Sequence, residues 1–212
     1  MDELIARFDL GRVQPGGAIF DLARLDWLNG QWIRRLPPSD LTERVLPFLA
    51  DSLAAEPAAR HATRQPTAED LEPLLPMVVE RLPRLDAIGP MLDFVFVEDL
   101  AVDLALLVPK RWDTSTTATG LEAALGIIES GGPVSFEADE LEPPLRALCE
   151  DRGWKVGDLF MAVRVAVTGR TATPPLFDTM VAIGYERTLA RLRAAVATLH
   201  MPHEEPDDAS LA

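Results

Sequence analysis

Residues 165–177, VAVTGRTATPPLF, hold the strongest local signals in the sequence. An apolar run ends at Thr168-Gly169, a basic and hydroxyl-rich stretch follows, and Pro174-Pro175 precedes a second apolar run. Glycine and proline are the residues that most often interrupt regular structure, and proline suits the first position of a helix. The stretch therefore predicts two apolar helices joined by a short, rigid corner.

The same punctuation recurs along the chain, which has 18 prolines and 13 glycines in 212 residues. Apolar residues repeat with helical spacing between the breaks, which predicts an all-α fold of many short helices. FVFVEDL (94–100) is strand-like, but it is too short to predict a sheet. The expected helices are 2–8, 21–28, 30–36, one opening at Ser39-Asp40, 67 to about 84, 114–131, 137–152, 156–168, 174–183 and 185–199.

Composition narrows the class of protein. The chain is 48% hydrophobic and 25% charged, which is ordinary for a globular protein, and its single cysteine, Cys149, excludes an internal disulfide. The first residues lack the apolar run of a signal peptide, and no apolar run is long enough to span a bilayer. We therefore expect a cytoplasmic protein. The net charge of -14 argues against a general nucleic-acid binder.

Charge is unevenly distributed. Residues 151–200 form the only net-basic block, with seven basic and four acidic groups. A local basic face on an acidic body can bind an anion while the body repels non-specific ones. Three of these arginines lie near the end of a predicted helix, where positive charge is favourable, and we expect them only to solvate that helix: Arg187, Arg191 and Arg193.

No catalytic motif occurs. The sequence lacks a GxxxxGK[ST] loop, a GxGxxG after a strand, HExxH and a Gly-x-Ser-x-Gly elbow. His200, His203, Glu204 and Glu205 could hold a metal, but they lie in a Pro- and acid-rich tail for which disorder is the better prediction. We therefore expect neither a metal site nor a self-contained active site.

Two long segments carry a resemblance to a known family. FDLGRVQPGGAIFDLARLDWLNGQWIR (8–34) and GWKVGDLFMAVRVAVTGRTATPPLFDTMVAIGYERTLARL (153–192) resemble blocks in the C-terminal part of bacterial glutamyl-tRNA synthetase. VVERLPRL (78–85) and FVFVED (94–99) resemble it more weakly. The blocks follow the family's order and spacing to about residue 197, and this shared order makes the resemblance specific.

The resemblance implies a domain organisation. Residues 1–36 would end a stem-contact domain, 37–93 and 94–200 would be two helical anticodon-binding subdomains, and 201–212 would be an acidic, disordered tail. The family's catalytic domain, with its HIGH- and KMSKS-like motifs, has no counterpart here. This chain would thus be part of a larger enzyme, and the ATP and Mg²⁺ of the family would belong to the absent domain.

The resemblance also implies that residues in and next to the quoted loop contact the anticodon. Family positions matching Arg164, Thr173 and Leu176 contact anticodon nucleotides. Single-stranded RNA is read by base stacking and by hydrogen bonds to base edges, for which Thr173 offers a hydroxyl and Leu176 an apolar surface. The alternative is that Leu176 lies in a helix core, as we expect for Phe177.

Further candidates for RNA contact are less sharply defined. Gly169 would allow a close backbone approach, and Arg170 is an adjacent cation. Arg24 and Trp27 fall in the first segment, where the family's positions lie near the inner face of the tRNA. For Trp27 a buried core position is an equal alternative.

Arg81 is the sharpest candidate. In VVERLPRL it aligns with an arginine that, in some members of the family, reads the third anticodon base. A guanidinium can pair with the carbonyl and ring nitrogen of cytosine but meets donors on the corresponding edge of guanine. The alternatives are a weak pair between Arg81 and a neighbouring acid, and a reading role for Arg84 instead.

The resemblance therefore implies recognition of the anticodon stem-loop of glutamate tRNA by a monomer attached to a catalytic domain. The alternative is a stand-alone helical interaction module that does not bind RNA, which the acidic composition favours.

Overall fold

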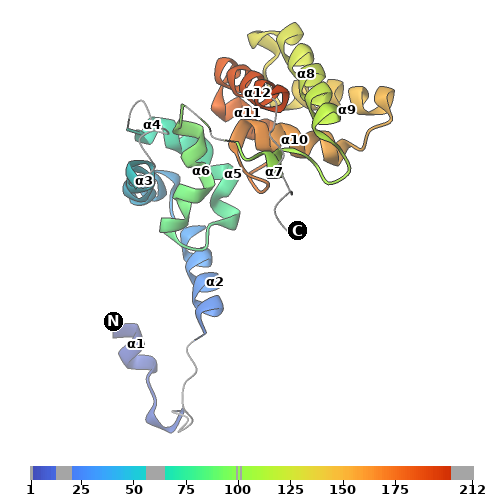
Figure 1. Ribbon diagram of the computed structural model, residues 1–212. Coiled ribbons are helices and arrows are strands. Elements are labelled where there is room, and N and C mark those ends of the chain that lie inside the picture. The colour runs from blue at the N-terminus through green and yellow to red at the C-terminus, as the bar shows by residue number, and fades with distance from the viewer. Residues whose placement is uncertain (1, 13–20, 56–64, 99, 101, 202–212) are drawn as a thin grey trace, which may run out of the picture.

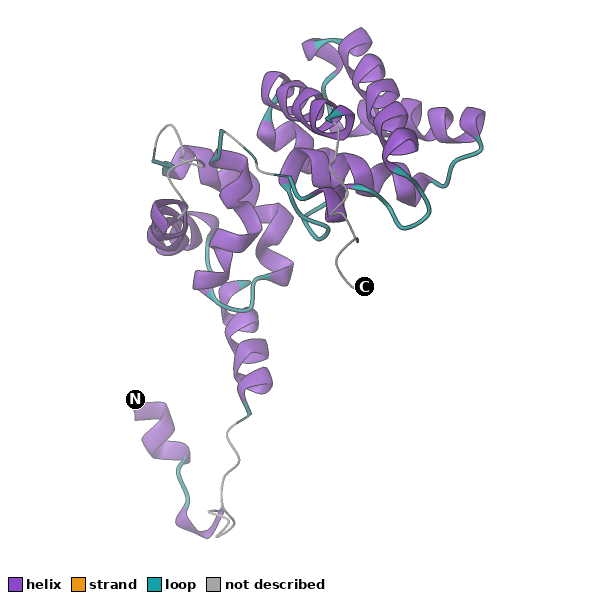
Figure 2. Ribbon diagram, in the orientation of Figure 1, coloured by secondary structure: helices purple, strands orange, loops and turns teal. Residues whose placement is uncertain are grey.

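The chain folds into short α-helices (Figures 1 and 2). Many of them begin or end at a proline or glycine or next to one. The computed structural model describes residues 2–12, 21–55, 65–98, 100 and 102–201. No residue in these ranges forms a β-strand, so the all-α prediction is confirmed. Within the same ranges no helix has both the length and the apolar character needed to cross a membrane.

The N-terminal part contributes α1 (Asp2–Arg7), the 3₁₀ helix η1 (Leu10–Arg12) and α2 (Leu22–Ile33). The predicted break at Asn29-Gly30 is wrong, because α2 runs through both residues. Gly30 is buried, and a Cβ atom at this position would lie 3.4 Å from the Leu82 carbonyl oxygen. Helix α2 thus packs at Gly30 against the segment that follows Arg81.

We call the helices from α3 to α6 the first subdomain and those from α7 to α12 the second. The described residues of the first subdomain form α3 (Pro38–Ala55), α4 (Ala68–Leu71), η3 (Glu72–Leu74), α5 (Leu75–Val78), η4 (Val79–Arg81), η5 (Leu85–Ala87) and α6 (Ile88–Phe96). The single helix predicted from 67 to about 84 is wrong. Pro73 and Pro76 have no N–H to donate, and the chain there divides into short helical turns. Thr67 begins α4 with a capping box, in which Thr67 N–H donates to Asp70 Oδ2 at 2.8 Å.

Helices α3 and α6 pack closely together. Leu41, Val45 and Leu49 recur every four residues on the buried face of α3. Gly89 of α6 lies against the Ser52 side chain, with no room for a Cβ atom. Helix α6 also contains residues 94–96, so the segment that looked strand-like ends a helix, and the predicted subdomain boundary at 93/94 falls inside α6.

The second subdomain contains α7 (Leu104–Leu107), α8 (Thr114–Gly131), η6 (Pro133–Ser135), α9 (Ala138–Arg152), α10 (Val156–Thr168), α11 (Leu176–Ile183) and α12 (Tyr185–His200). The bounds of α8 to α12 lie within one or two residues of the predicted ones. The Asp113 carboxylate caps α8 by accepting from Thr116 N–H at 2.7 Å. Gly153, at φ 67°, ends α9 in the left-handed conformation that glycine tolerates.

The two subdomains share one hydrophobic core. Buried side chains continue from α3 and α6 into α10, α11 and α12, and α6 contacts α11 directly (Figure 1). Residues 56–64 and nearly all of the predicted acidic tail, 202–212, lie outside the described residues. The junction at α6 brings the loop before α11 next to the segment that carries Arg81.

Candidate nucleic-acid interface

The loop between α10 and α11 is held in one shape by its own side chains. Gly169, at φ 70°, ends α10 and donates its N–H to Val165 O at 2.8 Å. The buried Thr168 hydroxyl donates to Arg164 O at 2.7 Å and accepts from Arg170 N–H at 3.2 Å. The expected rigid corner is therefore present, and α11 begins at Leu176, after both prolines rather than with them.

Arg164 and Thr173, both predicted to read RNA, lie together in this loop. Arg164 Nε donates to Thr173 Oγ1 at 3.1 Å, and that hydroxyl donates to Pro174 O at 2.9 Å. Partial burial lowers the pKa of Arg164 from its ordinary value. Its two terminal nitrogens have no hydrogen-bond partner among the described residues. They remain available to a phosphate or a base edge.

Leu176 does not offer its side chain to solvent. It is 4% exposed and belongs to the hydrophobic core, as does Phe177, whose ring meets Phe160 edge-on at 5.1 Å. The interpretation of Leu176 as an apolar surface for a base does not fit this placement, because the first turn of α11 packs inward. Contact between Leu176 and RNA stays a prediction, and it requires the backbone of this residue or a movement of the turn.

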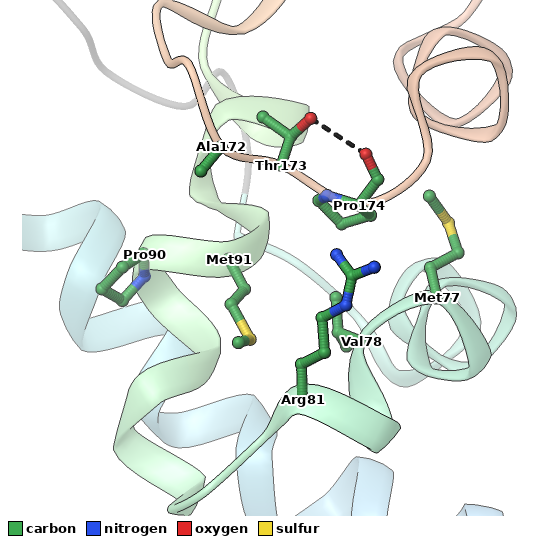
Figure 3. A pocket seen from close by; sticks show the side chains of 8 residues that line it. All are labelled: Met77, Val78, Arg81, Pro90, Met91, Ala172, Thr173 and Pro174. Carbon is green, nitrogen blue, oxygen red and sulfur yellow. Dashed lines mark hydrogen bonds between the residues drawn. The ribbon is translucent and has the colours of Figure 1, made fainter.

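A pocket of about 170 Å³ opens between the two subdomains (Figure 3). Side chains from the first subdomain form one wall, and the loop before α11 forms the other. Arg81 is the only charged residue of the lining, and its guanidinium points into the space below Pro174 (Figure 3). The eight lining residues are Met77, Val78, Arg81, Pro90, Met91, Ala172, Thr173 and Pro174.

The structure distinguishes Arg81 from Arg84. Arg81 is exposed and forms no ion pair or hydrogen bond with any described residue. Arg84 Nε donates to Asp86 at 3.0 Å, and its Nη1 lies 3.4 Å from Asp26. The hydrogen bond and charge of Asp86, followed by the charge of Asp26, raise the pKa of Arg84. Arg84 is thus held by protein groups, whereas Arg81 faces the pocket without a partner.

Trp27 lies on the surface of α2. Among the described residues its side chain is not covered by any core, and Trp27 is 60% exposed. The alternative of a core position is therefore wrong. Trp27 and Gly30 line a second hollow, of about 240 Å³, whose opposite wall includes Glu80 and Arg81. Arg81 therefore borders both hollows. Arg24, on the same helix, is exposed.

The three arginines of α12 do not all lie on a solvated face. Arg191 is 4% exposed, and its guanidinium donates to Val167 O at 2.6 Å, to Phe94 O at 2.8 Å and to Val97 O. Arg187 donates to Val95 O from the same helix. The expectation of merely solvated side chains is wrong for Arg191, which caps the unpaired carbonyls at the end of α6.

Sequence reasoning missed this buried arginine, although α12 carries a signal for it. Thr188, Leu192 and Ala195 lie on the buried face of α12, and helical spacing places Arg191 on that face. Arg193 points elsewhere and pairs with the exposed Glu129, as expected of a surface residue. The basic block thus divides into groups that face solvent and groups that bind the first subdomain.

No metal site is present in the part of the chain that the structure describes, where three metal-ligating side chains never gather. His200 Nε2 lies 2.8 Å from Glu122 of α8. His203, Glu204 and Glu205 lie outside the described residues.

Comparison with known proteins gives this geometry its context. The anticodon binding domain family matches residues 40–196, which include both subdomains. The chain belongs to this family.

The similarity to individual relatives extends beyond residues 40–196 of this chain. The glutamate–tRNA ligase of Roseiflexus sp. strain RS-1 is 45% identical over 93% of this chain and 38% of the relative, and that of Roseiflexus castenholzii is 43% identical over 96% and 39%. A crystal structure of a glutamate tRNA ligase from Elizabethkingia meningosepticum superposes with a TM-score of 0.70 at 25% identity, over 93% of this chain and 36% of that one. The chain thus spans less than two fifths of the length of these relatives.

Proposed function

We propose that this anticodon-binding region recognises the anticodon stem-loop of glutamate tRNA as the C-terminal part of a glutamate–tRNA ligase. The observation that carries the proposal is the unpaired Arg81, which faces Thr173 across a largely apolar pocket between the two subdomains. An anticodon loop presents unstacked bases, which proteins bind by combining an apolar surface with hydrogen bonds to base edges.

The pocket suits a single base. Its volume of about 170 Å³ is below the roughly 300–1,000 Å³ of sites that take drug-sized ligands. Met77 and Met91 provide adaptable apolar walls, and methionine accommodates irregular partners well. The Arg81 guanidinium would donate to the carbonyl and ring nitrogen of cytosine. Guanine would instead present N–H donors of its own to the N–H donors of Arg81. We therefore infer that Arg81 favours cytosine as the third anticodon base.

The other predicted contacts extend this surface. Arg164 has free terminal nitrogens beside Thr173 and would bind a phosphate or a base edge. Trp27 is exposed beside Arg81 and would stack against a neighbouring nucleotide. The catalytic domain of the proposed enzyme would use ATP and Mg²⁺ to attach glutamate at the far end of the tRNA. The net charge of -14 favours the alternative of an interaction module without RNA binding.

Titration at low salt separates these functions. We expect saturable binding of the glutamate anticodon stem-loop, weaker binding when the third anticodon base is changed from C to G, and loss of this difference in Arg81→Ala. One good bidentate contact between an arginine and a base discriminates by about 1–3 kcal/mol in nucleic-acid recognition. Arg84→Ala is the matched control and keeps the preference. Equal affinity of the unsubstituted chain for C and G would overturn the anticodon-reading proposal, and absence of binding would favour the interaction module.

A further inference from the structure

One side chain of the second subdomain connects the two walls of the pocket. Arg170, in the loop before α11, places Nη2 2.7 Å from Asp93 Oδ1 and 2.8 Å from Asp93 Oδ2. Its Nη1 donates to Pro90 O, and its guanidinium carbon lies 5.4 Å from the centre of the Phe94 ring. Arg170 thus binds α6 through an ion pair, a backbone carbonyl and an aromatic ring.

The carboxylate in this contact is itself held in place. The Asp93 side chain is 5% exposed, and its Oδ1 accepts from Phe94 N–H at 2.6 Å. Charge-assisted hydrogen bonds are shorter than neutral ones and roughly twice as strong. The contact therefore fixes both the distance and the orientation between α6 and the loop.

The position of the contact links it to the pocket. Pro90 and Met91, which line the first wall, come three and two residues before Asp93 on α6. Thr173, on the facing wall, comes three residues after Arg170 in a loop already held by Thr168. A change in the Arg170–Asp93 contact would therefore change the width of the pocket between Arg81 and Thr173.

We propose that Arg170 and Asp93 are a positioning pair, which holds the pocket at the width required to distinguish the third anticodon base. The inference rests on the proposed function. Arg170 acts through Thr173 and Arg81, and its guanidinium stays on α6 while RNA is bound. This role differs from the RNA contact that the sequence predicted for Arg170.

Asp93 separates the two roles. Its carboxylate is too buried to touch RNA, and removing its negative charge would favour the binding of a polyanion. If Arg170 contacts a phosphate, Arg170→Met weakens binding of the C and G stem-loops alike, and Asp93→Asn has no effect or strengthens both. If the two residues are a positioning pair, both substitutions reduce the preference for C over G.

The experiment measures that preference, the ratio of the dissociation constants for the G and C stem-loops, in Arg170→Met, Asp93→Asn and the double variant. Each single substitution is expected to lower the ratio about fivefold or more, the lower end of typical couplings between linked sites. The double variant is expected to show no further loss, and Arg170→Lys to recover part of the ratio. Arg193→Met is the matched control, because it removes one charge and one ion pair, with Glu129, inside the second subdomain.

A second readout needs no RNA. Spin labels at the exposed Asp51 of α3 and Ala147 of α9, in a Cys149→Ala background, report the distance between the subdomains by double electron–electron resonance. We expect Arg170→Met to broaden the distance distribution and Arg193→Met to leave it unchanged. Circular dichroism verifies that each variant is folded, and Arg170→Met and Arg170→Lys suffice if Asp93→Asn does not fold.

The possible failures are distinguishable. Equal binding of C and G by the unsubstituted chain would overturn the proposed function and, with it, this role of the pair. A clear preference for C that persists in Arg170→Met and Asp93→Asn would overturn the positioning role alone. An unchanged distance distribution in Arg170→Met would likewise overturn it.

Discussion

Replacing Arg191 by methionine tests the unexpected burial of a charge at the junction of the subdomains. The guanidinium donates to Val167 O, Phe94 O and Val97 O, and its Nε has no partner among the described residues. Burial, followed by the charge of Arg187, lowers the pKa of Arg191 to about 10, so the side chain stays charged at neutral pH. Methionine fills similar space without a charge or a donor.

The expected magnitude is a balance of two effects. Hydrogen bonds from a charged donor contribute about 1.5–3 kcal/mol each, so three contribute roughly 4–9 kcal/mol. Burial of a guanidinium without a carboxylate partner costs several kcal/mol, which the substitution removes. The three carbonyls lose their donors, which destabilises the fold, while the cost of burying the charge and its unpaired Nε disappears. We therefore expect Arg191→Met to lower the free energy of unfolding by about 2–4 kcal/mol.

Urea denaturation followed by circular dichroism measures this free energy. Arg193→Met is the control on the same helix, and loss of its exposed pair with Glu129 is expected to cost less than about 1 kcal/mol. Equal unfolding midpoints for Arg191→Met and Arg193→Met would mean that the buried hydrogen bonds only offset the cost of burying the charge, contrary to this expectation.

Three further predictions concern single sites. Gly89→Ala is expected to lower the free energy of unfolding by about 1–3 kcal/mol, because its Cβ meets the Ser52 side chain; an unchanged urea midpoint would contradict this. Hydrogen bonds from Thr116 hold the pKa of Asp113 below its ordinary value, so this residue stabilises the fold above about pH 4 and loses the contribution as the pH falls through the lowered pKa. In acid titrations of stability Asp113→Asn should show a shallower decline than the unsubstituted chain, and an identical decline would count against the cap. Burial raises the pKa of the Cys149 thiol, so a thiol reagent should react with it only after urea unfolding, and rapid labelling of the native protein would show that the core opens.

The helices of the second subdomain could be predicted because their ends depend on nearby residues. Asp113 begins α8, Gly153 ends α9 and Gly169 ends α10, each through a contact within a few positions of the chain. The first subdomain was predicted less well, because Pro73 and Pro76 change the kind of helix without removing helical spacing. The break predicted at Gly30 was wrong for a different reason, since α2 continues through this glycine, which is buried near the Leu82 carbonyl, far away in the sequence.

The sequence suggests candidate residues for the site, but it does not predict how they are arranged. The resemblance to a family motif suggested Arg81, Arg164 and Thr173. That Arg81 and Thr173 lie on opposite walls of one pocket depends on how α6 packs against the loop before α11. Arg170 contacts Asp93 across 77 positions of the chain, and no local pattern indicates that pairing. The inward turn of Leu176 likewise follows from packing against the second subdomain's core.

The most direct test of anticodon reading observes the Arg81 guanidinium itself. In a nitrogen–proton correlation spectrum of the labelled chain, Arg81→Lys and Arg84→Lys assign the two arginine Nε–Hε resonances. Saturation with the stem-loop that carries C as its third anticodon base should shift the Arg81 resonance and slow its exchange with water, while Arg84 stays paired with Asp86 and unchanged. If the C stem-loop saturates the chain and leaves the Arg81 resonance unshifted, anticodon reading by Arg81 is contradicted, because RNA would then bind without using the one charged residue that lines this pocket.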